Sequence, residues 1–454
     1  MKKQITLLAA IFALWSTGYA QAPQEPMRLS LQESINYALQ HRASLQAARN
    51  EEKIAKARVG EIRSAGLPQL NATVDAGDNF IQQQSFLPSE FFQNQDNPPP
   101  LGTFVPVTFA PAYTSNATIT GSQLLFDGTY LIGLKAASTY TELSRKNTQR
   151  SEIEVAEQVS KAYYSVLVNS ERMQLLTQNL VRLDTLLSQT STMYENGVAE
   201  KLDVDRLSVQ RNNLLVEQQK TQRLMAISEN LLKFQMGLNQ AQPVLLVDEL
   251  AEVEIDMSQV YPQDFDYANR IEFSILETQR DLASFQVQAD KAGYLPKLFL
   301  NARYGYNAAS NEFRDITRTG NYLEYGFVGV QLQLPIFDGL RKHYLIQQSK
   351  LALENTKLGF ETLRQSIDME LAQASTELTN ALDVLDARKA NMVLAEEIAR
   401  VAKIKFQEGV GTNLEVVSAE TDLREAQTNY YAAMYDALIA KVNLSRATGT
   451  LHSK

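Results

Sequence analysis

The 454-residue chain contains no cysteine, only three histidines and a single tryptophan, Trp15. The lack of cysteine excludes disulfides, thiolate metal sites, a thiol nucleophile and lipid attachment at an N-terminal cysteine. His41, His343 and His452 are far apart and lack metal-ligand spacing, and their default role is at the surface. No glycine-rich phosphate loop, Gly-x-Ser-x-Gly elbow or ATPase signature occurs. The sequence therefore predicts no enzyme activity, no cofactor and no metal.

Long hydrophobic runs are also scarce. One apolar run, residues 5–15, follows Lys2 and Lys3 and precedes Gly18 and Ala20, which predicts a secretory signal peptide over residues 1–20. After it, nothing approaches 18 consecutive apolar residues, so a mature chain that crosses a membrane must do so as strands. Without residues 1–20, 41 basic residues face 52 acidic ones, a net charge of −11 that makes nucleic acid an improbable partner.

The sequence is internally duplicated. Phe-Asp-Gly at 126–128 returns at 337–339, and the Asn-Gly-Val part of residues 195–198 returns as Glu-Gly-Val within 407–410. Leu-Pro pairs also open the two copies, at 67–68 and at 295–296, and the first copy carries about 17 more residues after its pair. Duplication with one variable loop indicates a fixed frame with a variable outer edge. We predict a first repeat over 21–240, an equatorial linker over 241–262 and a second repeat over 263–454.

Four segments alternate apolar and polar residues, as strands do. They form two predicted β-hairpins, 68–126 and 296–337. The apolar positions are Leu70, Ala72, Val74 and Ala76; Tyr113, Ala117, Ile119 and Leu125; Leu298, Leu300, Ala302 and Tyr304; and Val328, Val330, Leu332 and Leu334. An ordinary half-buried sheet has the same pattern. The remaining chain offers only helices too long to cover a small sheet, which favours strands of about 10 residues in a bilayer.

Four strands cannot close a barrel in lipid, because both sheet edges would expose unpaired backbone groups. The smallest transmembrane barrels have about eight strands. A trimer that shares a 12-stranded barrel is the simplest arrangement that also leaves a water-filled lumen.

Four runs lack glycine and proline: 134–196, 198–236, 360–408 and 412–448. They predict long helices within 129–236 of the first repeat and 340–448 of the second. As a helix, the longest would reach roughly 95 Å at 1.5 Å per residue. Apolar residues recur at spacings of three and four, as in Ile153, Ala156, Val159 and Tyr163. The polar faces suit a solvated exterior, a tunnel wall, or both. A non-conducting coiled-coil scaffold of the envelope is the alternative interpretation.

Two further segments have a predicted place. Residues 243–247 indicate a short strand within the linker. The proline-rich segment 80–111 is predicted to be an extracellular loop, which folds over the mouth of the barrel or anchors at the lipid interface.

The chain resembles the TolC family of outer-membrane efflux proteins over essentially its whole mature length. The resemblance rests on the two Leu-Pro pairs, the two Phe-Asp-Gly motifs, and a glycine followed six residues later by an acid, Gly197 with Asp203 and Gly409 with Glu415. It implies a mainly α fold with a β-barrel portion: a homotrimer whose 12-stranded barrel lies in outer-membrane lipid and continues as a long α-helical tunnel through the periplasm.

The resemblance also implies partners. A periplasmic adaptor protein would contact the turns at the far tip, and an inner-membrane pump of the RND or ABC type would supply the energy. The predicted tip residues are Gly197, Val198, Gly409, Val410, Gly411 and Thr412. The chain would then be a passive exit duct of a tripartite efflux pump or of a type I secretion system. The cargo is not encoded in this chain, because the pump selects it.

Some relatives carry two acidic rings just after the second turn. In this chain the matching positions are Glu415 and Ser418, and those of the first copy are Asp203 and Arg206. We hypothesise that Asp203 and Glu415 line the pore constriction, where ringed acids favour cations, and that Arg206 pairs with one of them in a closed state. The alternative is that both acids only stabilise helix N-termini.

Overall fold

The computed structural model describes residues 25–250, 265–318 and 321–451. The predicted signal peptide, residues 251–262 of the predicted linker and His452 lie outside the described residues. Two compact units emerge from the described chain: one comprises residues up to Glu51, 145–275 and 360–451, and the other comprises 52–144 and 276–359. Each unit draws on both predicted repeats. The repeat boundaries at 240 and 263 stay predictions.

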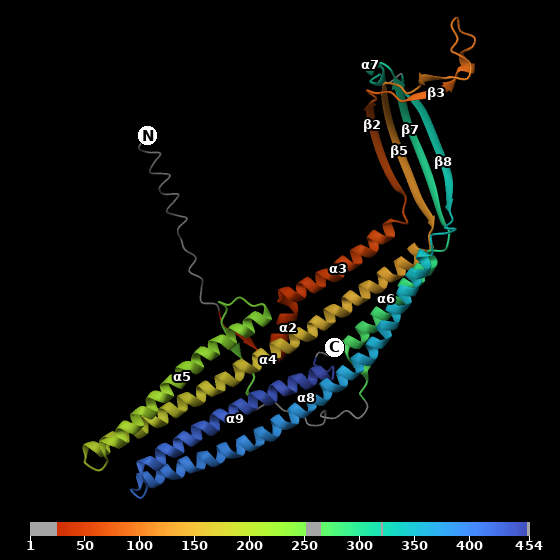
Figure 1. Cartoon of the computed structure of the whole chain (residues 1–454). Helices are drawn as coiled ribbons and strands as arrows, with labels where there is room; N and C mark the ends of the chain where they lie inside the picture. Colours follow the sequence, from red (N-terminus) through yellow and green to blue (C-terminus); the bar gives the residue numbers. More distant parts are fainter. Residues whose placement is uncertain (1–24, 251–264, 319–320, 452–454) are drawn as a thin grey trace, which may run out of the picture. The chain divides into compact units, whose positions relative to one another are not determined.

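The second unit contains a four-stranded antiparallel sheet in the order β2-β5-β7-β8 (Figure 1). Its strands are β2 (Gln69–Asp78), β5 (Tyr113–Phe126), β7 (Lys297–Ser310) and β8 (Leu323–Gln333). The four predicted strands are thus confirmed, in two sequential hairpins joined through β5 and β7. Within the described residues, β2 and β8 each have one edge that pairs with no other strand.

The register separates the two faces of this sheet. Leu70, Gly121, Ala302 and Val328 form one row across the four strands. The adjacent row lies on the opposite face and consists of Asn71, Thr120, Arg303 and Phe327. Apolar side chains on the first face stay open: Leu70 is 75% exposed and Val328 is 73% exposed. The sheet therefore has an apolar face without a cover in the described chain.

The segment predicted as a plain loop, 80–111, contains a small hairpin. Strands β3 (Gln84–Pro88) and β4 (Phe104–Thr108) pair antiparallel, and the short 3-10 helix η1 (Ser89–Phe92) follows β3. In the connection between β7 and β8 lies the one-turn helix α7 (Phe313–Ile316). Both features lie at the same end of the sheet, since Asp78, Tyr113 and Ser310 are paired neighbours in register.

The long helices form as the four runs predict. They are α4 (Gly128–Glu195), α5 (Lys201–Met236), α8 (Arg341–Gln407) and α9 (Asn413–Ala447). Helix α8 begins 19 residues before the glycine-free run and continues through Gly359, because one glycine costs a helix only about 1 kcal/mol. The shorter helices are α2 (Leu31–His41), α3 (Ala43–Ser64) and α6 (Ile271–Ala292). No described helix combines the length and apolar character needed to span a bilayer.

A two-stranded parallel ribbon joins the start of the first unit to the predicted linker. Strand β1 (Met27–Leu29) pairs with β6 (Val244–Leu246), which confirms the short strand predicted at 243–247. Tyr163 of α4 is fully buried beneath it and donates a hydrogen bond to Asp248 Oδ2 at 2.8 Å. Burial and this hydrogen bond raise the pKa of Tyr163. The tyrosine thus links α4 to the ribbon through a neutral hydroxyl.

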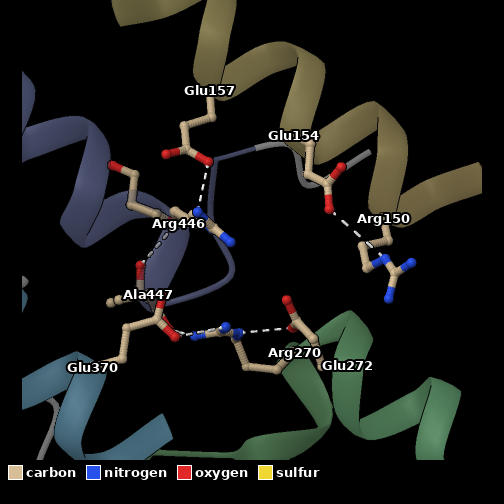
Figure 2. Close-up of polar contacts among 10 residues, drawn as sticks. Arg150, Glu154, Glu157, Arg270, Glu272, Glu370, Arg446 and Ala447 are labelled. Atoms are coloured by element: carbon tan, nitrogen blue, oxygen red, sulfur yellow. Dashed lines mark hydrogen bonds and ion pairs between the residues drawn. The ribbon is translucent and has the colours of Figure 1, made fainter. Parts of the chain in front are cut away.

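A buried arginine joins three helices of the first unit (Figure 2). Arg270 is 5% exposed, and its guanidinium contacts Glu272 Oε2 at 3.0 Å and Glu370 Oε2 of α8 at 2.9 Å. Its Nη1 donates to the carbonyl oxygen of Ala447, the last residue of α9, at 2.9 Å. Helix ends leave such carbonyls without intrahelical partners. We call Arg270, Glu272, Glu370 and Ala447 the arginine clasp.

The first prediction is that Arg270→Gln lowers the melting temperature of the purified protein in detergent. The change leaves two carboxylates and a helix-end carbonyl without their shared donor, at a cost of about 2–3 kcal/mol, since hydrogen bonds to charged groups are worth about that. Circular dichroism would report the loss of helix. Arg400→Gln is the matched control: Arg400 pairs with Glu397 in the same helix with both side chains exposed, so we expect little change. Equal melting of both variants would contradict a structural role for the clasp.

The clasp also predicts a pH dependence. Burial disfavours the charged form of Glu272, but the hydrogen bond and charge of Arg270 outweigh it and lower the pKa below the ordinary 4.5. A depressed carboxylate pKa adds stability that is complete above the ordinary value and is lost as pH falls through the folded-state pKa. The gap in melting temperature between wild type and Arg270→Gln should therefore shrink on acidification below about pH 4.5. A gap that is constant from pH 7 to pH 3 would contradict this assignment.

Candidate functional site at the helical turns

The two turns that join the long helices have the same backbone geometry. Gly197 and Gly409 both adopt φ of +74°, a conformation that glycine enters without steric cost. The amide of Val198 donates to the carbonyl oxygen of Met193 at 2.8 Å, and that of Val410 to the carbonyl oxygen of Lys405 at 3.0 Å. These are Schellman closures of α4 and α8. The repeated sequence signature is thus a repeated helix stop.

Both turns present an exposed apolar side chain. Val198 is 71% exposed and Val410 is 80% exposed. The backbone amide of Gly411 also donates to the carbonyl oxygen of Lys405, at 3.0 Å. Thr412 then starts α9, where its Oγ1 accepts from the amide of Glu415 at 3.3 Å. The residues predicted for the tip therefore form two compact turns, each with a solvent-exposed valine.

Asp203 is engaged at the start of α5. Its Oδ2 accepts from the backbone amide of Glu200, the residue that caps the helix, at 3.4 Å. Its Oδ1 lies 3.9 Å from Arg206 Nη1, one turn further along. The structure therefore brings Asp203 and Arg206 together, and it places the Asp203 carboxylate at the capped start of α5.

Glu415 occupies the equivalent third position of α9 but is less engaged. Its side chain is exposed, and among the described residues no basic group lies within 4 Å of its carboxylate. Ser418, one turn later, is exposed as well. Arg206 pairs with Asp203 and not with Glu415. The helix dipole favours an acid at both sites, so a pore-lining role for either one stays a prediction.

Polar side chains that the sequence analysis did not single out connect the two helical hairpins. Asn413 is 4% exposed, and its Nδ2 donates to the carbonyl oxygen of Asp203 at 3.1 Å. Further along, Asn179 of α4 donates to Gln427 of α9 at 2.8 Å, and both side chains are buried. The sequence signal for the second contact is that Asn179 and Gln427 are polar residues within otherwise apolar helix faces. The first contact holds α5 against α9 next to the turns, and the second holds α4 against α9 about four helical turns further along.

The amino-acid sequence of both halves of the chain matches a known protein family. The family model described as "Outer membrane efflux protein" matches residues 34–238 and 267–450. The chain belongs to the outer membrane efflux protein family. The resemblance inferred from the sequence motifs is thereby confirmed.

Relatives of this outer membrane efflux protein align with most of its length. "Outer membrane protein TolC" of Vibrio cholerae is 22% identical, with 99% of this chain and 96% of the relative covered. "Toluene efflux pump outer membrane protein TtgC" of Pseudomonas putida is 24% identical, with 74% and 69% covered.

Solved structures share the fold of this efflux protein. A membrane protein from Pseudomonas aeruginosa superposes with a TM-score of 0.71 at 20% identity, over 92% of each chain. The CmeC outer membrane channel of Campylobacter jejuni gives a TM-score of 0.70 at 14% identity, over 92% of this chain and 85% of that one.

Family membership establishes the general role. This efflux protein is an outer-membrane exit channel for an efflux system, and it lies in the outer membrane and extends into the periplasm. The family consists of transport proteins that work together with partner proteins. The described residues contain no cluster of three or more histidine, cysteine or acidic side chains able to hold a metal.

Proposed function

We propose that three copies of this chain form one passive duct, closed in the outer membrane by a shared 12-stranded barrel. The observation that carries the proposal is the sheet, which has one exposed apolar face and two unpaired edges. Water would penalise the apolar face, whereas lipid would penalise the edges. Closing the sheet with further copies in lipid removes both penalties.

The strand directions permit such closure. The four strands alternate in direction, so β8 of one copy would lie antiparallel to β2 of the next. Every backbone donor and acceptor along both edges then finds a partner, as a lipid-embedded sheet requires. Three copies supply 12 strands, enough to leave a water-filled lumen. Asn71, Thr120 and Arg303 would face that lumen.

We further propose roles for the two turns. Val198 and Val410, with Gly197, Gly409, Gly411 and Thr412, would contact the hairpins of a periplasmic adaptor. An inner-membrane pump of the RND or ABC type would drive transport and choose the cargo, in an efflux pump or a type I secretion system. The printed name of the TtgC relative assigns that protein to a toluene efflux pump, which supports the efflux setting.

Electrophoresis and fractionation test the duct. The mature protein should fractionate with the outer membrane and run as a trimer in SDS without heating, and as a monomer after boiling. Deletion of the gene should raise the intracellular accumulation of the exported compound. A detergent-free soluble monomer would contradict the proposal.

For the constriction, we predict that Glu415→Gln reduces cation preference. Three copies would place three exposed Glu415 carboxylates around the passage, and ringed acids attract cations in a narrow pore. The reversal potential in a salt gradient across a planar bilayer reports this preference directly. Ser418→Ala is the neutral control one turn away. An unchanged reversal potential for Glu415→Gln would show that the acid serves only the helix start.

A further inference from the structure

The hairpin of β3 and β4 exposes much apolar surface for a segment outside a core. We call residues 84–108 the hairpin arm. Four of its side chains are more than 60% exposed: Phe86 at 68%, Phe91 at 74%, Leu101 at 73% and Phe104 at 66%. An aromatic side chain has on the order of 150–250 Å² to bury, so the three phenylalanines alone expose about 300–500 Å², an area comparable to the largest apolar patch on a typical monomer, which is often functional. Such a surface marks a contact site.

The composition of the segment favours a protein partner over a lipid surface. Residues 79–111 contain six phenylalanines but no tryptophan, tyrosine, lysine or arginine, and their only charged residues are Glu90 and Asp96. Membrane interfaces select tryptophan and tyrosine, and anionic lipids select lysine and arginine. Protein interface cores are instead rich in phenylalanine and poor in charge.

The position of the arm indicates which protein. Its base is tied to the end of β7, since Gln82 Nε2 lies 3.4 Å from Asn311 Oδ1 and the Ala112 amide donates to the same oxygen at 3.0 Å. From there the arm, drawn in orange, extends on the β8 side of the sheet (Figure 1). Beyond β8 the sheet has an unpaired edge. A further copy at that edge would be the first surface that the arm meets.

That neighbouring copy would offer an apolar counterpart at the same level. If β8 of one copy pairs antiparallel with β2 of the neighbouring copy, the end of the neighbour's β2 and the start of the neighbour's β5 lie next to the arm. There Phe313 of α7 is 61% exposed and packs edge-on against Tyr113, with ring centres 5.6 Å apart. Tyr322 holds the same connection by donating to Ser115 Oγ at 3.0 Å. The counterpart is thus an anchored aromatic surface.

We infer that the hairpin arm of each copy docks on α7 and the adjoining start of β5 of the next copy. The inference rests on the proposed shared barrel, and it assigns the arm to subunit contact rather than to a lid or a lipid anchor. Three arms would link the copies head to tail around the outer rim, beyond the strand pairing itself.

Crosslinking tests this contact, because the chain has no cysteine of its own. The double variant Leu101→Cys with Phe313→Cys, treated in native outer membranes with a short bis-maleimide, should give covalent dimers and trimers on boiled gels. The control pair is Leu101→Cys with Ile336→Cys; Ile336 is 96% exposed and lies past the other end of β8, so this pair should give monomers only. Monomers from the first pair, or equal ladders from both, would overturn the inference.

Two further measurements distinguish the other possible results. Fluorescence tests whether the hairpin arm contacts lipid, and unheated gels test whether the trimer forms at all. In Phe91→Trp protein without residues 1–20, the new tryptophan is the sole one, since Trp15 is absent. Its fluorescence in vesicles should not be quenched by brominated lipids; strong quenching would overturn the inference in favour of a lipid anchor. An SDS-resistant trimer without the crosslink refutes only the arm contact. Absence of any trimer refutes the proposed function as well.

Discussion

Val328→Lys should abolish the SDS-resistant trimer and transport with it. Val328 lies in the middle of β8 on the apolar face and is 73% exposed. In the proposed barrel this side chain meets lipid near the midplane, where lysine costs about 2–4 kcal/mol. Each trimer carries the change three times, so the total penalty is about three times that value. Unheated gels of outer-membrane fractions would show loss of the trimer band.

The matched control is Gln331→Lys, three residues along the same strand. Gln331 lies on the opposite face and accepts a hydrogen bond from Asn301 at 3.1 Å. That face already carries Arg303, so an added lysine should leave the trimer intact and alter only conductance. Equal loss of the trimer in both variants, or in neither, would contradict the assignment of the faces to lipid and water.

A double change at the turns, Val198→Asp with Val410→Asp, should abolish transport while the trimer survives. Both valines are more than 70% exposed at turns closed by backbone hydrogen bonds, so the fold does not depend on their side chains. In the proposed adaptor contact, each aspartate would be desolvated without a partner, at a cost of about 2 kcal/mol or more. Two such changes cost about 4 kcal/mol together and weaken binding roughly 1,000-fold, since each 1.4 kcal/mol is a factor of ten.

Co-purification of the adaptor after crosslinking in cells reports this binding, and unheated gels report the trimer. Val181→Asp is the control: Val181 is 63% exposed on α4, several turns before the tip. Normal transport by the double variant would contradict the proposed contact. Loss of the trimer would instead show that the turns have a structural role.

The sequence predicted the elements whose signals are local and long. Alternation in residues such as Leu70, Ala72 and Val74 predicts β2 and its two faces, because side chains alternate along a strand. Runs without glycine or proline predict the four long helices to within a few residues at most ends. The glycine-free run alone would start α8 too late, because Gly359 interrupts the run without ending the helix. The predicted helical segment 340–448 nevertheless begins one residue before Arg341, the first residue of α8.

Features that depend on distant pairing were harder to predict. Strands β3 and β4 have five residues each and contain Pro88 and Pro106. The alternation of apolar and polar residues therefore covers too few positions to indicate a strand, and proline disfavours one. At the turns, sequence identified Gly197 and Gly409 through their repeated motif. It did not identify Asn413, whose contact is with the backbone of Asp203, 210 residues away. Only the folded chain brings these two groups together.

Conductance of the purified mature protein in a planar lipid bilayer tests the shared barrel most directly. Strands β2, β5, β7 and β8 from three copies would enclose one water-filled passage, so the current should rise in discrete, uniform steps that coincide with the SDS-resistant trimer fraction. Protein converted to monomers by boiling should give no steps. A trimer that inserts into the bilayer and never conducts would contradict the account.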